Sequence, residues 1–145
     1  MDNQVFNTVF ETSLRVILLL REKSSLTSGQ IACADFIATF ARYFETTDVN
    51  LNGDGRLQLR GFSVRRRLVQ SAIRKLVVKG FLAPVFDGKN FLYKLTDQGV
   101  KFSEELKVDY AMNYRNAVKY ILQRWPDLKE SELSDMINNQ QRILN

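Results

Sequence analysis

The chain has 145 residues, of which 45% are hydrophobic and two are proline, and its net charge is +5 at pH 7. This composition is typical of a compact globular protein and excludes a disordered or collagen-like chain. The apolar run over residues 16–20 is far too short to cross a membrane, and the opening Met-Asp-Asn-Gln is not a basic signal-peptide start. The single cysteine, Cys33, cannot form an internal disulfide. We therefore expect a cytoplasmic protein.

The first predicted element is a helix over residues 3–23. Its apolar side chains recur at helical spacing, at Val5, Phe6, Val9, Phe10, Leu14 and Ile17. Val16, Leu19 and Leu20 add apolar surface outside this stripe. We therefore expect the helix to be covered on more than one side, either by the chain's own core or by a partner chain.

A second helix is predicted over residues 28–44, and Cys33 lies inside it. The chain has no histidine, so Cys33 lacks the usual general base of a cysteine nucleophile, and we expect it to be a small packed residue. A lone cysteine also offers no zinc cluster, and no Ser-His pair exists. We therefore predict a protein that is not an enzyme and that has no cofactor and no metal.

The next segment, residues 48–59, begins like a calcium-binding loop. Oxygen-bearing side chains stand at positions 1, 3 and 5 and a glycine at position 6, which are Asp48, Asn50, Asn52 and Gly53. Position 12, where an EF-hand has a bidentate glutamate, is Leu59, and position 9 is Arg56. Asn, Asp and Gly also make ordinary tight turns. We interpret the loop as structural and expect no calcium.

A third helix and a hairpin follow the loop. Ser63 is placed to cap a helix over residues 63–79, which Gly80 stops. Two short apolar runs, residues 81–86 and 91–95, flank an Asp-Gly pair, which predicts a β-hairpin. Thr96 is placed to cap a fourth helix. This order is the plan of a winged-helix domain, in which the third helix and the hairpin form one continuous surface.

The remaining residues predict more helix. A long helix is expected over residues 103–124, stopped by Pro126, and a last helix is expected to start at Ser131. The predicted fold is therefore mainly α, with a winged-helix domain (three helices plus a β-hairpin wing) over residues 1–102 and a C-terminal helical extension over residues 103–145.

The positive charge is concentrated in one segment. Residues 55–86 contain eight Lys or Arg and no acid, whereas the remainder has 13 basic and 16 acidic side chains. Helical geometry puts Arg67, Gln70 and Arg74 on the outward face of the third helix. The candidate residues for contact with nucleic acid or a partner protein are Arg65, Arg66, Arg67, Gln70, Arg74, Lys75, Lys79 and Lys89.

Three interpretations of this outward face stay open. In a winged-helix domain the face can enter the major groove, where Arg reads guanine and Gln reads adenine, with Lys89 meeting a phosphate. Val78 on the same face suits a protein partner better. Arg65 and Arg66 lie in the first turn, where positive charge opposes the helix dipole, so we expect them to reach an acidic partner or solvent. The face therefore binds nucleic acid, binds an acidic protein surface, or is merely solvated.

Several short motifs, taken in order, carry a resemblance to a known family. They are Glu11-Thr-Ser-Leu-Arg-Val-Ile-Leu-Leu-Leu20, Asp35-Phe-Ile, Asn50-Leu-Asn-Gly-Asp54, Arg66-Arg-Leu-Val-Gln70, Lys79-Gly-Phe81, Phe91-Leu-Tyr93 and Asp109-Tyr110. Over about residues 11–120 the chain resembles the middle component of bacterial ABC three-component systems, the Lamassu-type, SMC-like defence systems.

The resemblance implies a non-catalytic adaptor subunit in anti-phage defence. Its expected partners are an SMC-like or Rad50-like ATPase subunit and an effector subunit, commonly a nuclease, with DNA contacted through the complex and no membrane. The alternative function, from a different class, is a stand-alone winged-helix transcription regulator that binds DNA. An ATPase gene and an effector gene beside this one favour the adaptor.

Overall fold

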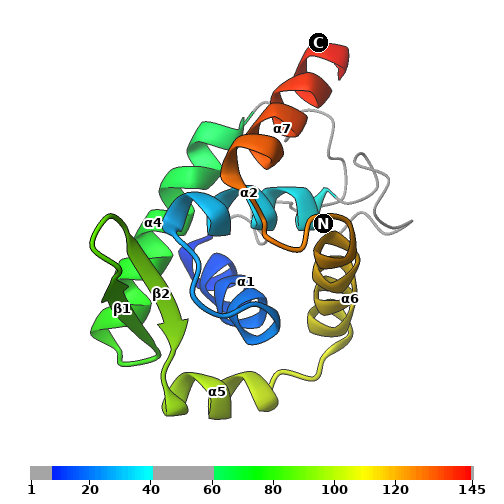
Figure 1. Cartoon of the computed structure of the whole chain (residues 1–145). Coiled ribbons are helices and arrows are strands. Elements are labelled where there is room, and N and C mark those ends of the chain that lie inside the picture. Colours follow the sequence, from blue (N-terminus) through cyan, green and yellow to red (C-terminus); the bar gives the residue numbers. More distant parts are fainter. Residues whose placement is uncertain (1–7, 41–60, 145) are drawn as a thin grey trace.

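The computed structural model describes residues 8–40 and 61–144 of the chain. In chain order its elements are α1 (Val9–Glu22), α2 (Ser28–Thr39), α4 (Phe62–Val78), β1 (Leu82–Phe86), β2 (Phe91–Leu95), α5 (Asp97–Glu104), α6 (Asp109–Arg124) and α7 (Glu130–Leu144) (Figure 1). The predicted mainly α fold class, with a β-hairpin wing directly after a basic helix, is confirmed. The loop over residues 48–59, with its calcium-like spacing, lies outside the described residues.

The first helix crosses the middle of the molecule. Figure 1 shows α1 surrounded by α2, α4, α5 and α6. Every side chain from Val16 to Leu20 is at most 2% exposed, because the surrounding helices cover α1 on several sides. The prediction that this helix is covered on more than one side is therefore confirmed, and the covering elements belong to the chain's own core.

Side-chain caps set the starts of the first two helices. Thr8 caps α1 by accepting a hydrogen bond from the backbone N–H of Glu11, whereas the predicted start at residue 3 lies outside the described residues. Thr27 and Gln30 form a reciprocal capping box at α2. The second helix ends at Thr39, with Phe40 as its C-cap, and the predicted continuation over residues 41–44 lies outside the described residues.

The basic helix α4 begins differently from the prediction. Its N-cap is Gly61 and no side chain caps it, so Ser63 lies in the first turn and the predicted Ser63 cap is wrong. The predicted end is confirmed to within a residue. Gly80 has a φ of 84°, which suits glycine, and the backbone N–H of Phe81 donates to the carbonyl of Leu76.

The predicted hairpin is present. β1 and β2 pair antiparallel from Leu82 opposite Leu95 to Phe86 opposite Phe91. At the tip, Asp87 Oδ1 accepts hydrogen bonds from the backbone N–H groups of Lys89 and Asn90. These two bonds, that of Asn90 first, hold the pKa of Asp87 below its usual range.

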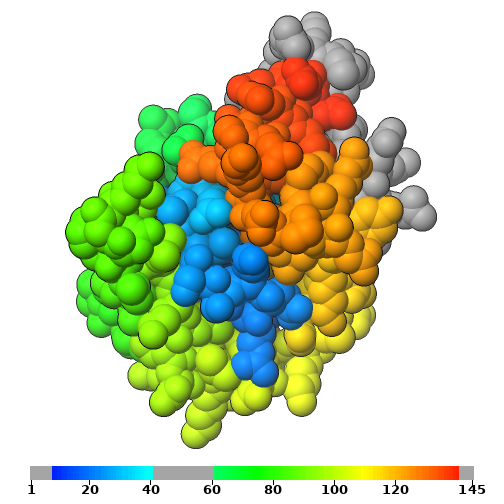
Figure 2. Space-filling view, in the orientation of Figure 1, coloured from blue at the N-terminus to red at the C-terminus, as the bar shows by residue number. Residues whose placement is uncertain are grey.

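The wing is also tied to the rest of the molecule. The residue Leu26, between α1 and α2, forms an isolated bridge with Tyr93 of β2. Figure 2 shows this α1–α2 connection, in blue, reaching the surface between the hairpin and the pair α6 and α7. The bridge fixes the position of the wing relative to the core.

The predicted fourth helix and the predicted long helix are both present, but the long helix starts at Asp109 and not at residue 103. α5 starts at its predicted cap, Thr96, and ends at Glu104, while α6 starts after an extended residue, Val108, with φ of −74° and ψ of 160°. The predicted start was wrong because residues 105–108 contain no glycine or proline to mark the boundary between the two helices. The break lets α6 turn back and pack against α1 and α2.

The last two helices share the hydrophobic core of the first. Tyr114 and Ile121 of α6, and Leu133 and Ile137 of α7, are buried in the same cluster as α1 and α2. The division into residues 1–102 and 103–145 stays a prediction. Among the described residues, no helix combines the length and apolarity needed to span a membrane.

Candidate partner and nucleic-acid interface

Three of the predicted contact residues form an exposed row on α4. Arg67, Gln70 and Arg74 are exposed at spacings of three and four residues along one side of the helix. Arg74 Nη2 donates to Ser71 Oγ at 3.2 Å, which orients the guanidinium along the helix surface. We call Arg67, Gln70 and Arg74 the basic ridge. Lys89 is exposed at the tip of the wing.

Arg66 points to a different neighbour. Its Nη2 lies 3.4 Å from Glu130 Oε2 at the start of α7, and both side chains are more than two-fifths exposed. An exposed pair of this kind contributes about 0–1 kcal/mol to stability. Arg66 thus pairs with an acid of its own chain, and contact of Arg66 with an acidic partner protein stays a prediction.

Arg65 lies inside the molecule, so it is not available to an external partner. It is 4% exposed, and its Nη2 donates to Asp35 Oδ2 at 3.1 Å and to Thr39 Oγ1 at 3.3 Å. The guanidinium also lies 5.8 and 5.7 Å from the ring centroids of Phe36 and Phe40. Arg65 precedes Val69 by four residues and therefore shares the inward stripe of α4, a signal that the sequence already contained.

Asp35 is the centre of a buried charge cluster that the sequence analysis did not identify. Arg15 Nε donates to its Oδ1 at 2.9 Å, and the Tyr114 hydroxyl donates to the same oxygen at 2.7 Å. Burial alone would raise the pKa of Asp35, but the charges of Arg15 and Arg65 outweigh it and hold this pKa below its usual range. The cluster joins α1, α2, α4 and α6.

The cluster contains two guanidinium groups and one carboxylate, so its charges are not balanced. Burial and the charge of Arg15 lower the pKa of Arg65. Within the described part of the chain, Nε and Nη1 of Arg65 have no hydrogen-bond partner. The aromatic faces of Phe36 and Phe40 offset part of that cost. The cluster acts on the basic ridge indirectly, by fixing α4 against α1 and α2.

The wing carries an exposed apolar surface beside the basic ridge. Paired residues of an antiparallel hairpin share a face, so Phe86 and Phe91 lie together, with ring centroids 5.1 Å apart. They are 57% and 58% exposed, and Val78 at the end of α4 is 86% exposed. We call Val78, Pro84, Phe86 and Phe91 the wing patch. A depression of about 350 Å³ lies between it and α4, lined by Ile73, Arg74, Val77, Val78, Pro84, Phe91 and Tyr93.

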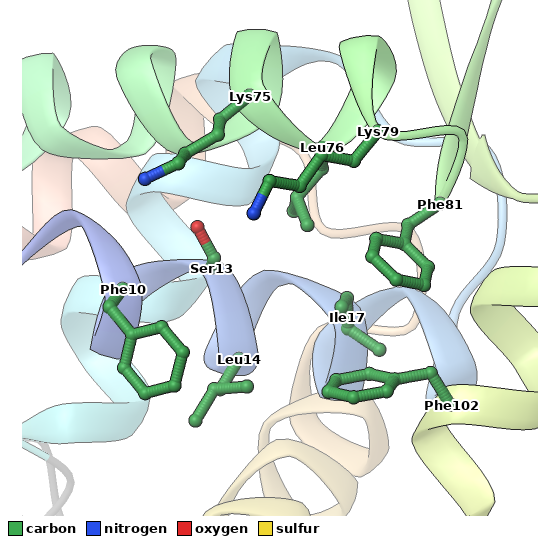
Figure 3. A pocket seen from close by; sticks show the side chains of 9 residues that line it. All are labelled: Phe10, Ser13, Leu14, Ile17, Lys75, Leu76, Lys79, Phe81 and Phe102. Atoms are coloured by element: carbon green, nitrogen blue, oxygen red, sulfur yellow. The ribbon is translucent and has the colours of Figure 1, made fainter.

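Lys75 and Lys79 lie on the other flank of α4, beside a second apolar pocket. Figure 3 shows both side chains extending from α4 across this pocket toward α1. The pocket has a volume of about 220 Å³ and is lined by Phe10, Ser13, Leu14, Ile17, Lys75, Leu76, Lys79, Phe81 and Phe102. We call it the α1–α4 pocket. The two lysines are therefore separated from the basic ridge, although the sequence places all five residues in one basic segment.

The described residues hold no group of three or more His, Cys, Asp or Glu side chains that could bind a metal ion. Cys33 is buried, and this burial raises the pKa of its thiol to about 12. A thiol with such a pKa is a poor nucleophile at neutral pH. The prediction that Cys33 is a packed residue is confirmed.

Comparison with known proteins gives one family. The family model described as "ABC-three component (ABC-3C) system Middle Component 2" matches residues 5–143 of the chain. No curated protein and no solved structure matches the chain significantly. The match extends on both sides of residues 11–120, over which the short motifs carried the resemblance, and it includes α7.

Proposed function

Because this chain belongs to the Middle Component 2 family of ABC-three component systems, we propose that it is a non-catalytic adaptor subunit in anti-phage defence. It joins an SMC-like or Rad50-like ATPase to an effector nuclease, as in Lamassu-type systems. The family supports the role of one component among several. The adaptor role, the identity of the two partners and contact with DNA belong to this proposal.

The wing patch is the observation that carries the adaptor function. Contiguous apolar surface of this kind, next to charged residues, is typical of protein–protein interfaces. Phe86 and Phe91 have no packing role in the core that would explain their aromatic character, since more than half of each side chain is exposed. A hairpin whose sole role is to contact phosphates would present basic residues here. We infer that the wing docks on one of the other components.

The basic ridge supports a second, weaker contact with DNA in the assembled complex. Arg67 and Arg74 are exposed and have no carboxylate partner among the described residues, and Lys89 lies at the wing tip. Phosphate contacts dominate binding by such a small set of charges, so little sequence preference is expected. A stand-alone transcription regulator would use the same ridge, but it would not need the wing patch.

Co-purification of the chain with the two proteins encoded beside its gene tests the adaptor function. We expect a complex of the three proteins that survives size-exclusion chromatography. Phe86→Ser combined with Phe91→Ser should remove one component from it, because apolar anchors contribute most of the energy of an interface.

The matched control is Tyr120→Ser, which replaces an exposed aromatic residue on α6, away from the wing. Both variants should keep the unfolding temperature of the unmodified chain to within a few degrees. If the unmodified chain instead elutes alone as a dimer, with neither neighbour, the adaptor function is wrong.

A further inference from the structure

The α1–α4 pocket has an apolar floor and a charged mouth. Ile17, Leu76 and Phe102 are among the side chains that form its walls in Figure 3. At the open end Phe10 is 65% exposed, although it is a large apolar side chain. The Ser13 hydroxyl donates to the carbonyl of Val9 at 2.7 Å, so it presents no free donor to a ligand. The pocket therefore suits an apolar group.

Lys75 and Lys79 make the mouth of the α1–α4 pocket positively charged. Lys75 and Lys79 extend over the mouth, and among the described residues neither ammonium group forms an ion pair. An occupant that covered them without offering carboxylates would bury two unpaired charges, which is costly. Acidic residues beside the apolar group would instead pair with both lysines.

The size of the pocket favours one side chain over a small molecule. Sites for drug-sized ligands have volumes of about 300–1,000 Å³, whereas this pocket has about 220 Å³. Anchor residues at protein interfaces are typically single large side chains that fill such a pocket and are surrounded by polar contacts.

We propose that the α1–α4 pocket binds one aromatic or large aliphatic side chain of a partner protein, presented on a segment that carries Asp or Glu next to it. This inference rests on the proposed adaptor function and extends it. The wing patch and the α1–α4 pocket lie on different flanks of α4. The chain thus has two separate docking surfaces, as a protein that joins two others requires.

Photochemical cross-linking locates the occupant. A benzophenone-bearing phenylalanine replaces Phe10 in the chain, which is then co-expressed with the two proteins encoded beside its gene. We expect the cross-link to fall in a segment of one of these proteins that has an apolar residue flanked by Asp or Glu. A cross-link to a second copy of this chain, or to nucleic acid, would overturn the proposal.

Charge reversal measures the contribution of the lysines. Lys75→Glu combined with Lys79→Glu should weaken the affinity for the cross-linked component roughly tenfold or more, since two interface ion pairs become repulsive. Lys119→Glu combined with Lys129→Glu changes the net charge equally, at exposed positions away from the pocket, and should have little effect. Changing the partner's acidic residues to Lys should restore binding to the reversed chain.

Leu14→Trp tests the apolar part of the pocket independently of charge. Leu14 is half-buried in the pocket wall, so the larger ring would occupy the space of the partner's side chain. We expect about a 30-fold loss of affinity, which is typical of a blocked anchor. If the unmodified chain forms the complex but neither Leu14→Trp nor the lysine reversal weakens it, this inference is wrong and the adaptor function stands. If the unmodified chain forms no complex, both fail.

Discussion

At the scale of single residues, Asp35 determines how four helices meet. Its carboxylate accepts hydrogen bonds from Arg15 of α1, Arg65 of α4 and Tyr114 of α6. Each donor comes from a different part of the sequence, up to 79 residues away. A single buried acid therefore positions the helix that carries the basic ridge.

Removal of this charge should strongly destabilise the fold. Asp35→Asn leaves the two buried guanidinium groups of Arg15 and Arg65 without a counter-charge, and breaking a buried pair typically costs about 3–5 kcal/mol. Urea unfolding of Asp35→Asn and the unmodified chain measures the difference. Asp135→Asn changes an exposed acid on α7 and should alter the free energy of unfolding by about 0.5 kcal/mol at most. A loss as small as that for Asp35→Asn would contradict the proposed role of the cluster.

The same residue predicts an acid dependence of stability. The pKa of Asp35 in the folded chain is below its unfolded value of about 3.9. Its contribution is therefore fully present above pH 3.9 and is lost as the pH falls toward and through the folded pKa. The difference in unfolding free energy between the unmodified chain and Asp35→Asn should be constant from neutral pH to about pH 4 and then shrink. A difference that stays constant down to pH 2 would show that Asp35 is not the titrating group.

At the scale of elements, one glycine sets how closely α5 approaches the wing. Gly99 donates its backbone N–H to the Thr96 hydroxyl in the first turn of α5. A Cβ at this position would collide with the backbone carbonyl of Phe81, at the start of the hairpin. Only glycine therefore allows α5 to pack against the base of the wing as it does.

Gly99→Ala should destabilise the chain by about 1–3 kcal/mol, the usual cost of overpacking. Helix propensity alone would make Gly99→Ala stabilising, because alanine is favoured over glycine in a helix by about 1 kcal/mol. A destabilised variant would therefore indicate the collision. Gly61→Ala is the matched control, since a Cβ at Gly61 meets no atom within 4 Å, and the expected cost is a few tenths of a kcal/mol. Thermal unfolding of both variants decides the question. Equal unfolding temperatures for the two would refute the close-approach argument.

At the scale of the whole molecule, the described structure distributes the basic segment over several surfaces. Arg65 is in the core, Arg66 faces α7, and Lys75 and Lys79 extend over the α1–α4 pocket. Among the predicted contact residues that the structure describes, Arg67, Arg74 and Lys89 remain as the basic side chains available for the proposed contact with DNA. The number of phosphate contacts expected in the complex is therefore small.

The salt dependence of DNA binding measures how many phosphate contacts this chain makes in the complex. Each phosphate contact contributes roughly −0.9 to the slope of log affinity against log salt, so three contacts give about −2.7. Arg67→Glu combined with Arg74→Glu should make the slope of the assembled complex shallower by about 1.8 and weaken binding, while the complex still assembles. Lys75→Glu combined with Lys79→Glu should leave the slope unchanged. If Arg67→Glu with Arg74→Glu instead prevents assembly and the residual complex keeps its DNA affinity, the ridge is a protein-docking surface.

Most of the local structure could be predicted from the sequence. Helical periodicity predicted α1, α2, α4 and α7, the Asp-Gly pair predicted the hairpin, and Thr96 and Gly80 were identified as a helix start and a helix stop. These features depend on residues within a few positions of each other, so they can be identified without knowing the fold. The family, too, was evident from short motifs in order.

Which charged side chains are exposed depends on how elements distant in sequence pack together. Arg65 and Arg67 are two residues apart and equally basic, yet α2 covers one and leaves the other exposed. Lys75 belongs to the α1–α4 pocket because α1 packs beside it, and α6 is tied to α2 where the Tyr114 hydroxyl donates to Asp35. In each case the deciding neighbour is distant in sequence. The spacing of Arg65 and Val69 already indicates an inward position, but the partner that makes the burial of this charge tolerable, Asp35, comes from a distant element.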